Sequence, residues 1–251
     1  MMLAIEGLSK RFGGFLAVNE VSFEARAGEI LGLIGPNGSG KTTTFNLIAG
    51  TLRPSAGSIR FAGAEIASLA AHAICHQGIA RTFQIPRPFR RLSLVENVAL
   101  AAYYGAGGHI PRAEAGHRAA EALALVGLPG DAATTAGLGA AALKKLELAR
   151  ALATRPRLLL ADESLGGLDA TEMEHAASLL ESIRSRMGVT IIWVEHIMGV
   201  LMRIVDRVIV LDHGVKIFEG APALAAADAR VTEVYLGKKR AEGRTQPGTQ
   251  A

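Results

Sequence analysis

Residues 31–45 read Leu-Gly-Leu-Ile-Gly-Pro-Asn-Gly-Ser-Gly-Lys-Thr-Thr-Thr-Phe, and the rest of the chain is organised around them. Residues 35–42 fit the pattern G-x-x-x-x-G-K-[ST] at every position, and the apolar run Ile30–Ile34 stands directly before them. This run predicts a buried strand that leads into a loop, and the residues from Thr42 onward predict a helix. A strand, a glycine-rich loop and a helix in this order are typical of a phosphate-binding loop.

Each position of the predicted loop has a chemical task. Glycine at positions 35, 38 and 40 lets successive backbone N–H groups turn inward around phosphate oxygens. Lys41 is long enough to reach the β- and γ-phosphates of a nucleotide, and the Thr42 hydroxyl is a ligand for the Mg²⁺ that bridges them. The residues expected at the phosphates are Gly35, Pro36, Asn37, Gly38, Ser39, Gly40, Lys41, Thr42 and Thr43.

The composition sets limits on the class of protein. The chain has 251 residues, of which 49% are hydrophobic, which is enough for one domain or for one domain with an inserted lobe. Its apolar stretches fall short of the roughly 18 residues of a spanning helix, and its N-terminus lacks the pattern of an export signal. We therefore expect a polypeptide of the reducing cytosol, in agreement with the single cysteine.

Charge and metal-binding residue types add little to this picture. The net charge of +4 permits a nucleic acid or an anionic membrane as partner, but the basic residues are scattered, and we expect no nucleic acid. His72, Cys75 and His76 lie close together in the sequence without a second pair of ligands, so we expect no metal site there.

The remaining sequence alternates between helical and strand patterns, which predicts an α/β fold. The expected elements are antiparallel strands within 3–27 joined at Gly13-Gly14, a helix over 42–51 ended by Gly50, a strand within 54–61, a strand over 78–84 ending at Gln84, a helix over 171–187, a strand over 189–194, a hairpin over 207–219 and a last helix reaching Leu236.

A helical lobe is expected at about residues 86–154, inserted in the α/β core. This region is rich in alanine and leucine at helical spacing, and Ser93 with Glu96 three positions later has the sequence of a capping box. We expect residues 1–237 to form a single domain. The polar residues 238–251 are expected to be a disordered tail.

An acidic pair follows a second apolar strand. Residues 157–161 are continuous and apolar after Arg157, and they run into Asp162 and Glu163. Where a phosphate-binding loop is present, one such carboxylate holds Mg²⁺ and the other polarises the attacking water. We assign Asp162 to the first task and Glu163 to the second. His196 follows the next strand and is expected at the same edge of the sheet.

These motifs together resemble the nucleotide-binding subunit of ABC transporters. The resemblance covers residues 3–237, and the fold it implies is a P-loop NTPase with a RecA-like core, an N-terminal antiparallel β subdomain and an inserted helical subdomain. The segments that carry it are Gly35–Thr42, Gln84, Leu138–Leu152, Leu158–Glu163, Gly167–Asp169 and His196.

The resemblance also implies roles for single residues. Phe12 matches the aromatic residue that stacks on adenine, although from the sequence alone ordinary core packing is equally open. Gln84 matches the glutamine that touches Mg²⁺ and senses the transmembrane partner. Asp169 matches the aspartate that crosses the dimer interface, and His196 the histidine on the γ-phosphate.

In the family, two such subunits sandwich two ATP molecules and drive a permease between access states. The implied partners are a second ABC ATPase subunit, transmembrane permease subunits and, indirectly, a substrate-binding protein. The implied location is the cytoplasmic face of the inner membrane, as a peripheral subunit. Translation and repair ATPases of the family carry two domains or long insertions, which this chain lacks.

Finer features resemble the LivG-type subunit of branched-chain amino acid importers. They are Arg81–Gln84, Leu94–Val98, Val194–His196 and Val231–Gly237. The ATPase of lipopolysaccharide export has a similar ending and is the alternative. The transported substrate is not encoded in this chain, because selectivity lies in the permease and the binding protein.

One departure from the family pattern concerns the signature motif, usually Leu-Ser-Gly-Gly-Gln. This chain has Leu138, Gly139, Ala140, Ala141 and Ala142 there. The missing serine hydroxyl would donate to the γ-phosphate on the other subunit, a hydrogen bond worth about 1.5–3 kcal/mol. We expect weak hydrolysis at the site that this signature completes, and hence a heterodimer, with a homodimer or a low-turnover regulatory subunit as alternatives. Ser164 replaces the usual proline, with little expected effect.

Overall fold

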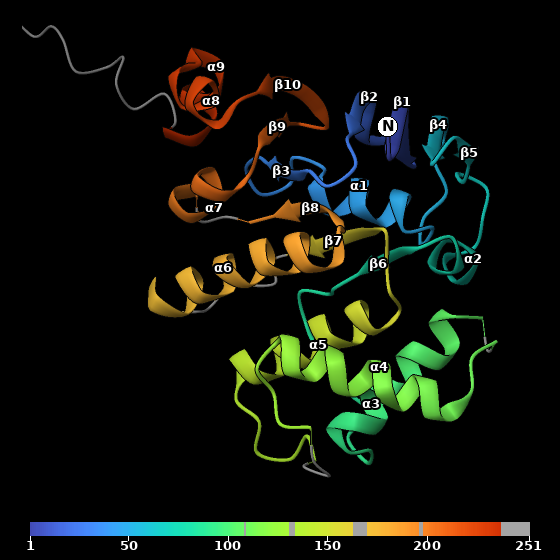
Figure 1. The fold of residues 1–251 in the computed structure, drawn as a ribbon. Helices are drawn as coiled ribbons and strands as arrows, with labels where there is room; N and C mark the ends of the chain where they lie inside the picture. Colours follow the sequence, from blue (N-terminus) through green and yellow to red (C-terminus); the bar gives the residue numbers. More distant parts are fainter. Residues whose placement is uncertain (108, 131–133, 163–169, 196–197, 237–251) are drawn as a thin grey trace, which may run out of the picture.

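A computed structural model describes residues 1–107, 109–130, 134–162, 170–195 and 198–236. They form two β-sheets with helices around them (Figure 1). This arrangement confirms the predicted α/β fold. The antiparallel sheet has the order β2-β1-β4-β5 and contains β1 (Leu3–Phe12), β2 (Phe15–Ala25), β4 (Ala56–Phe61) and β5 (Ala64–Glu65).

The second sheet is mostly parallel. Its order is β10-β9-β3-β8-β7-β6, and only β10 runs antiparallel to its neighbour. Every residue of β3, β7 and β8 is buried, as expected for strands covered on both faces. Its strands are β3 (Ile30–Ile34), β6 (Ile79–Arg81), β7 (Leu158–Asp162), β8 (Thr190–Val194), β9 (Arg207–Asp212) and β10 (Val215–Gly220).

Helices cover the parallel sheet and connect its strands. The described helices are α1 (Lys41–Ile48), α2 (Ala71–His76), α3 (Leu94–Gly105), α4 (Arg112–Leu125), α5 (Ala140–Ala153), α6 (Ala170–Met187), α7 (Met198–Ile204), α8 (Pro222–Ala227) and α9 (Ala229–Leu236). Within the described ranges, none of these helices has the length and apolar character needed to cross a bilayer.

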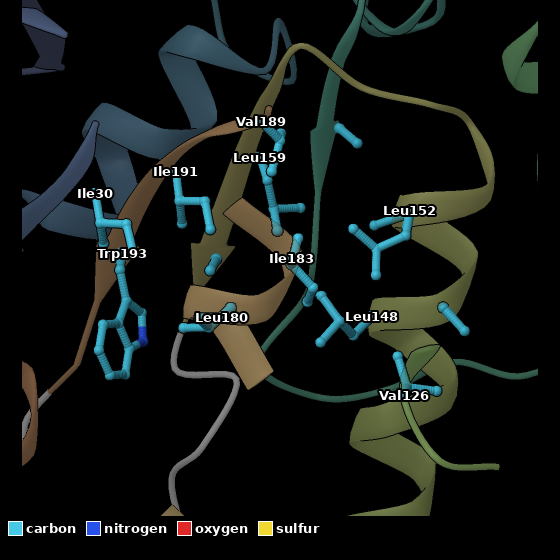
Figure 2. Close-up of a cluster of buried hydrophobic side chains, with 14 of the residues drawn as sticks. Ile30, Val126, Leu148, Leu152, Leu159, Leu180, Ile183, Val189, Ile191 and Trp193 are labelled. Carbon is cyan, nitrogen blue, oxygen red and sulfur yellow. The ribbon is translucent and has the colours of Figure 1, made fainter. Parts of the chain in front are cut away.

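Strand β3 separates two hydrophobic clusters. Ile30 and Ile34 belong to the cluster that includes Leu180 and Ile183 of α6 and Leu148 of α5. Figure 2 shows the labelled side chains of Ile30, Leu148, Leu180 and Ile183, together with Trp193 of β8, which belongs to the same cluster. Leu31 and Leu33 belong to the other cluster, where α1 packs with the antiparallel sheet. This alternation holds the loop after β3 firmly from both sides.

The helices α3, α4 and α5 lie together, between β6 and β7 in the chain and below the sheets in Figure 1. The predicted capping box at the start of α3 is confirmed, because the Glu96 N–H donates to Ser93 Oγ at 3.2 Å and the Ser93 N–H donates to Glu96 Oε2 at 2.7 Å. The boundaries of a domain over 1–237 with an inserted subdomain at 86–154 stay predictions, and residues 238–251 lie outside the described part.

The structure corrects one predicted boundary and adds one helix. The strand expected over 78–84 is only Ile79–Arg81, because the next residue, Thr82, turns its side chain to the backbone of Asp162 and the chain leaves the sheet. The last helix ends at Leu236 as predicted, because α9 is Ala229–Leu236, and a separate short helix, α8, precedes it. Asp228 separates them, since its Oδ1 accepts the N–H groups of Arg230 and Val231 and so caps α9.

Candidate phosphate-binding site

The loop between β3 and α1 has a backbone that only glycine fits at two positions. Gly35 has φ 152° and Gly40 has φ 101°. A Cβ at Gly35 would lie 2.2 Å from the carbonyl oxygen of Leu211, and one at Gly40 would lie 2.7 Å from that of Ala17. The loop is therefore pressed between β2 and the end of β9, and its shape is set before any ligand binds.

Two polar side chains are buried inside this loop. Lys41 is 5% exposed, and its Nζ donates to the carbonyl oxygens of Gly35 and Pro36, both at 2.8 Å. The hydroxyl of Ser39 is also buried, and it has no hydrogen-bond partner among the described residues. A buried hydroxyl without a partner is costly unless a ligand satisfies it. A phosphate oxygen in the loop would accept from both groups.

The helix α1 begins at the end of the loop without a side-chain cap. Gly40 is its N-cap residue, and no acidic residue stands in the first turn. Thr42 is exposed and Thr43 is half-buried at this helix start. The first backbone N–H groups and the helix dipole thus favour an anion at the loop. Residues 36–39 border a cavity of about 560 Å³.

Asp162 lies at the same edge of the sheet as the loop. It ends β7, which is parallel to β8, and β8 is parallel to β3, so all three strands end at this edge. Its carboxylate is buried and forms an ion pair with Arg81, with 2.7 Å between Nη2 and Oδ2. Its backbone N–H donates to Thr82 Oγ1 at 3.1 Å. Gln84, two residues after Thr82 in the chain, is exposed.

Phe12 lies at the turn between β1 and β2. Its ring is 45% exposed and belongs to neither hydrophobic cluster, so core packing is not its role. The Nζ of Lys10 lies 5.2 Å from the ring centroid. Phe12 ends β1, and β2 leads from this turn to Ala17, whose carbonyl oxygen lies close to Gly40. The exposed ring therefore belongs to the hairpin whose second strand borders the loop.

The altered signature forms the start of α5. Gly139 is the N-cap residue with φ −68° and ψ 169°, and it makes no side-chain cap. Leu138 packs against the core, whereas Ala140 is exposed and Ala141 half-buried. No side chain at the N-cap position accepts a hydrogen bond from the first backbone N–H groups of α5.

Three predicted site residues lie outside the described part of the chain, namely Glu163, Asp169 and His196. Glu195, the neighbour of His196, is buried where β8 ends. The structure brings to the site two residues that the sequence analysis noted only as parts of LivG-like segments, without a role of their own. One is Arg81, whose signal was a charge inside an expected buried strand. The other is Tyr235 of α9. Burial raises the pKa of the Tyr235 phenol to about 12, although a hydrogen bond with the backbone of Gly35 acts to lower this pKa.

Comparisons with known proteins find a matching family and similar chains. Residues 18–166 match the family described as ABC transporter. The chain is 36% identical over 250 residues to the high-affinity branched-chain amino acid transport ATP-binding protein BraF of Pseudomonas aeruginosa, covering 94% of this chain and 98% of that protein. It is 34% identical, with the same coverage, to LivG of Escherichia coli K12, which has the same description.

A solved structure shows the same fold. The nucleotide-free ATP-binding cassette from an ABC transporter superposes with a TM-score of 0.84 at 26% identity, covering 94% of this chain and 99% of that one.

Proposed function

This chain belongs to the ABC transporter family, and from this premise we propose that it is the ATP-hydrolysing subunit of an importer for branched-chain amino acids or related small polar or aromatic solutes. Members of the family bind ATP and energise transport. The observation that carries the proposal is the preformed loop with Lys41 and the unpartnered Ser39 hydroxyl inside it. The substrate class rests on the similarity to BraF and LivG.

We propose that Mg²⁺ accompanies the nucleotide. The residues that fit it are Thr42, Asp162 and Gln84, which offer a hydroxyl, a carboxylate and an amide oxygen. Such all-oxygen donors suit this hard cation. Bound Mg²⁺ would neutralise charge on the β- and γ-phosphates. Lys41 would exchange the carbonyl oxygens of Gly35 and Pro36 for phosphate oxygens and so hold the nucleotide in place.

We assign the chemical step to residues that follow β7 and β8 in the sequence. Glu163 would orient and polarise the attacking water, and His196 would contact the γ-phosphate. Phe12 would stack on the adenine, because its exposed ring is available at the hairpin that borders the loop. Asp169 would reach across to a second ATPase subunit.

The second subunit would complete the site with its signature motif. In this chain that motif starts α5 at Gly139 and carries no hydroxyl. We therefore propose a heterodimer in which this chain's loop pairs with a complete signature of the partner. The converse site, built on Gly139, would be weak, and a homodimer would have two weak sites.

The membrane partners follow from the family. Transmembrane permease subunits would receive the motion of the ATPase dimer, and a substrate-binding protein would deliver the solute to them. The chain would then lie at the cytoplasmic face of the membrane as a peripheral subunit. It has no need of a spanning helix for this task.

Steady-state ATP hydrolysis by the purified chain, alone and with its candidate partner subunit, tests this proposal. Glu163→Gln serves as the control, because it keeps the loop but removes the carboxylate. We expect hydrolysis to rise when the partner is added and to fall to background in Glu163→Gln. Equal rates in wild type and Glu163→Gln with the partner present would contradict the assignment.

A regulatory subunit of low turnover is a second candidate, favoured by the missing hydroxyl at Gly139. The two candidate functions differ in whether a partner subunit raises the rate of ATP hydrolysis. A chain that binds ATP tightly, yet hydrolyses it no faster than Glu163→Gln with any ATPase partner, is regulatory.

A further inference from the structure

The guanidinium of Arg81 is buried beside the expected metal site, between Asp162, Asn46 and two aromatic rings. Its Nη2 donates to Asp162 Oδ2 at 2.7 Å, and its Nη1 donates to Asn46 Oδ1 at 2.5 Å. The side chains of Arg81 and Asp162 are only 8% and 4% exposed. The ring centroids of Phe83 and Phe45 lie 5.1 and 5.9 Å from the guanidinium carbon.

A purely structural task explains this cluster poorly. Taking two charges out of water is costly, and well-packed apolar side chains often serve stability equally well. The guanidinium does, however, fix where one of the two carboxylate oxygens of Asp162 lies. A divalent cation needs oxygen ligands in defined positions. The ion pair is therefore better explained by the positioning of Asp162 than by the stability of the fold.

Arg81 also fixes two separate elements relative to each other. Asn46 lies on α1, one helical turn after Thr42, so the two share one face of the helix. Asp162 lies at the end of β7. The planar guanidinium spans both partners at once, which an ammonium group cannot do with the same rigidity.

We propose that Arg81 is a positioning residue that holds Asp162 and, through Asn46, the start of α1 in the arrangement that receives the metal ion of the bound nucleotide. This inference rests on the proposed function, since it assumes that Mg²⁺–ATP is the ligand. Its consequence is specific. Loss of Arg81 weakens the contribution of Mg²⁺ to nucleotide affinity and leaves the binding of ATP without metal nearly unchanged, because the hydrogen bonds of Arg81 go to Asp162 and Asn46 rather than to the phosphate-binding loop.

Calorimetric titration of ATP, with Mg²⁺ and with a chelator, tests the inference in the full chain. A Glu163→Gln background prevents turnover. The quantity of interest is the ratio of the two affinities. We expect Arg81→Met to lower this ratio about tenfold, the size of one lost charged hydrogen bond, and Arg81→Lys to restore part of it. Affinity in chelator should change by less than about twofold.

Two further variants serve as a control and as a milder form of the same change. Arg157→Met is the matched control, because the Arg157 guanidinium also stacks on a ring, Phe61 at 5.2 Å, but lies away from Asp162. It should leave the ratio unchanged. Asn46→Ala releases one arm of Arg81 without leaving a buried charge unpaired, and it should lower the ratio by a smaller factor even if Arg81→Met fails to fold.

The outcomes separate the two proposals. A wild-type chain that does not bind ATP at all would overturn the proposed function. A wild-type chain that binds Mg²⁺–ATP, together with an unchanged ratio in folded Arg81→Met, would overturn the role of Arg81 alone. If Arg81→Met does not fold, an unchanged ratio in Asn46→Ala has the same meaning.

Discussion

Two helices of this protein begin after a glycine, and the two glycines are there for different reasons. Gly40 precedes α1 with φ 101°, and Gly139 precedes α5 with φ −68°. A Cβ at Gly40 would lie 2.7 Å from the Ala17 carbonyl oxygen, whereas a Cβ at Gly139 would meet nothing within 4 Å. Neither helix has a side-chain cap or an acidic residue in its first turn.

The difference shows how a helix start becomes a specific site. Both ends offer backbone N–H groups to an anion. At α1, the neighbouring strands press on the loop and bury Lys41 and Ser39 inside it. At α5, nothing presses on Gly139, and the first turn carries only alanine. Packing and side chains, rather than the helix end itself, make the first site a strong one.

Replacing each glycine by alanine gives the largest contrast. We expect Gly40→Ala to lower the free energy of unfolding by about 1–3 kcal/mol, because alanine is strained at this φ. The same change should weaken ATP binding more than about 100-fold, since two or more hydrogen bonds to charged phosphate oxygens are disturbed. Gly139→Ala should cost less than about 1 kcal/mol and leave binding to the loop intact.

Chemical unfolding and calorimetric titration measure these two effects. A Gly40→Ala variant that binds ATP as tightly as wild type would show that the loop tolerates a side chain, and the contrast between the two helix starts would disappear.

Gly139→Ser makes the weaker helix start resemble the family signature. The backbone angles of Gly139 suit serine, and the space beside it is open. We expect ATP hydrolysis at the site that this signature completes to rise by about 10- to 150-fold, the equivalent of a hydrogen bond of 1.5–3 kcal/mol to a charged group. The free energy of unfolding should rise by only a few tenths of a kcal/mol, as for an added N-cap.

Steady-state hydrolysis and thermal unfolding check both parts. Gly139→Ala is the matched control because it adds a carbon without a hydroxyl. If Gly139→Ser and Gly139→Ala have the same rate, the hydroxyl is not what this signature lacks.

Ser39→Ala should have effects of opposite sign on stability and binding. Its buried hydroxyl has no partner in the described part of the chain, so its removal should raise the free energy of unfolding without nucleotide by about 1 kcal/mol. ATP affinity should fall by about tenfold, because a phosphate oxygen loses a donor. Urea unfolding with and without ATP separates the two effects. A loss of stability in both conditions would mean that Ser39 is a structural residue.

What the sequence could predict follows from how far apart the interacting residues are. The loop from Gly35 to Thr42 and the capping box at Ser93 are formed by consecutive or nearby residues, so their patterns are visible in the chain. The pair Arg81 and Asp162 is 81 residues apart, and Tyr235 meets Gly35 from the far end of the chain. Only folding brings such groups together.

Hydrogen bonds of polar side chains explain where the chain departs from the simplest prediction, at the end of β6 and between α8 and α9. Asp228 has the sequence of an N-cap, yet it stands within a run of alanines that favours one continuous helix. Thr82 has a high strand propensity, yet its hydroxyl binds the backbone of Asp162. In both cases a polar side chain changed the backbone path locally, which propensities averaged over a window do not capture.

A buried charge further along α5 gives the last and smallest test. Glu147 is 7% exposed, and burial raises the pKa of its carboxyl above the ordinary 4.5, although Arg150 opposes this. The folded state therefore binds more protons than the unfolded state between these two pKa values. The contribution of Glu147 to the free energy of unfolding is complete below pH 4.5 and is lost as pH rises through the raised pKa. The slope of this loss is at most about 1.4 kcal/mol per pH unit.

Urea unfolding over this pH range should show that Glu147→Gln removes the downward slope. Glu96 is the matched control of opposite sign, because hydrogen bonds from Ser93 lower the pKa of its carboxyl below 4.5. Its contribution is lost as pH falls, so Glu96→Gln should affect only the acid side. An unchanged slope in Glu147→Gln would mean that Arg150 compensates for the burial.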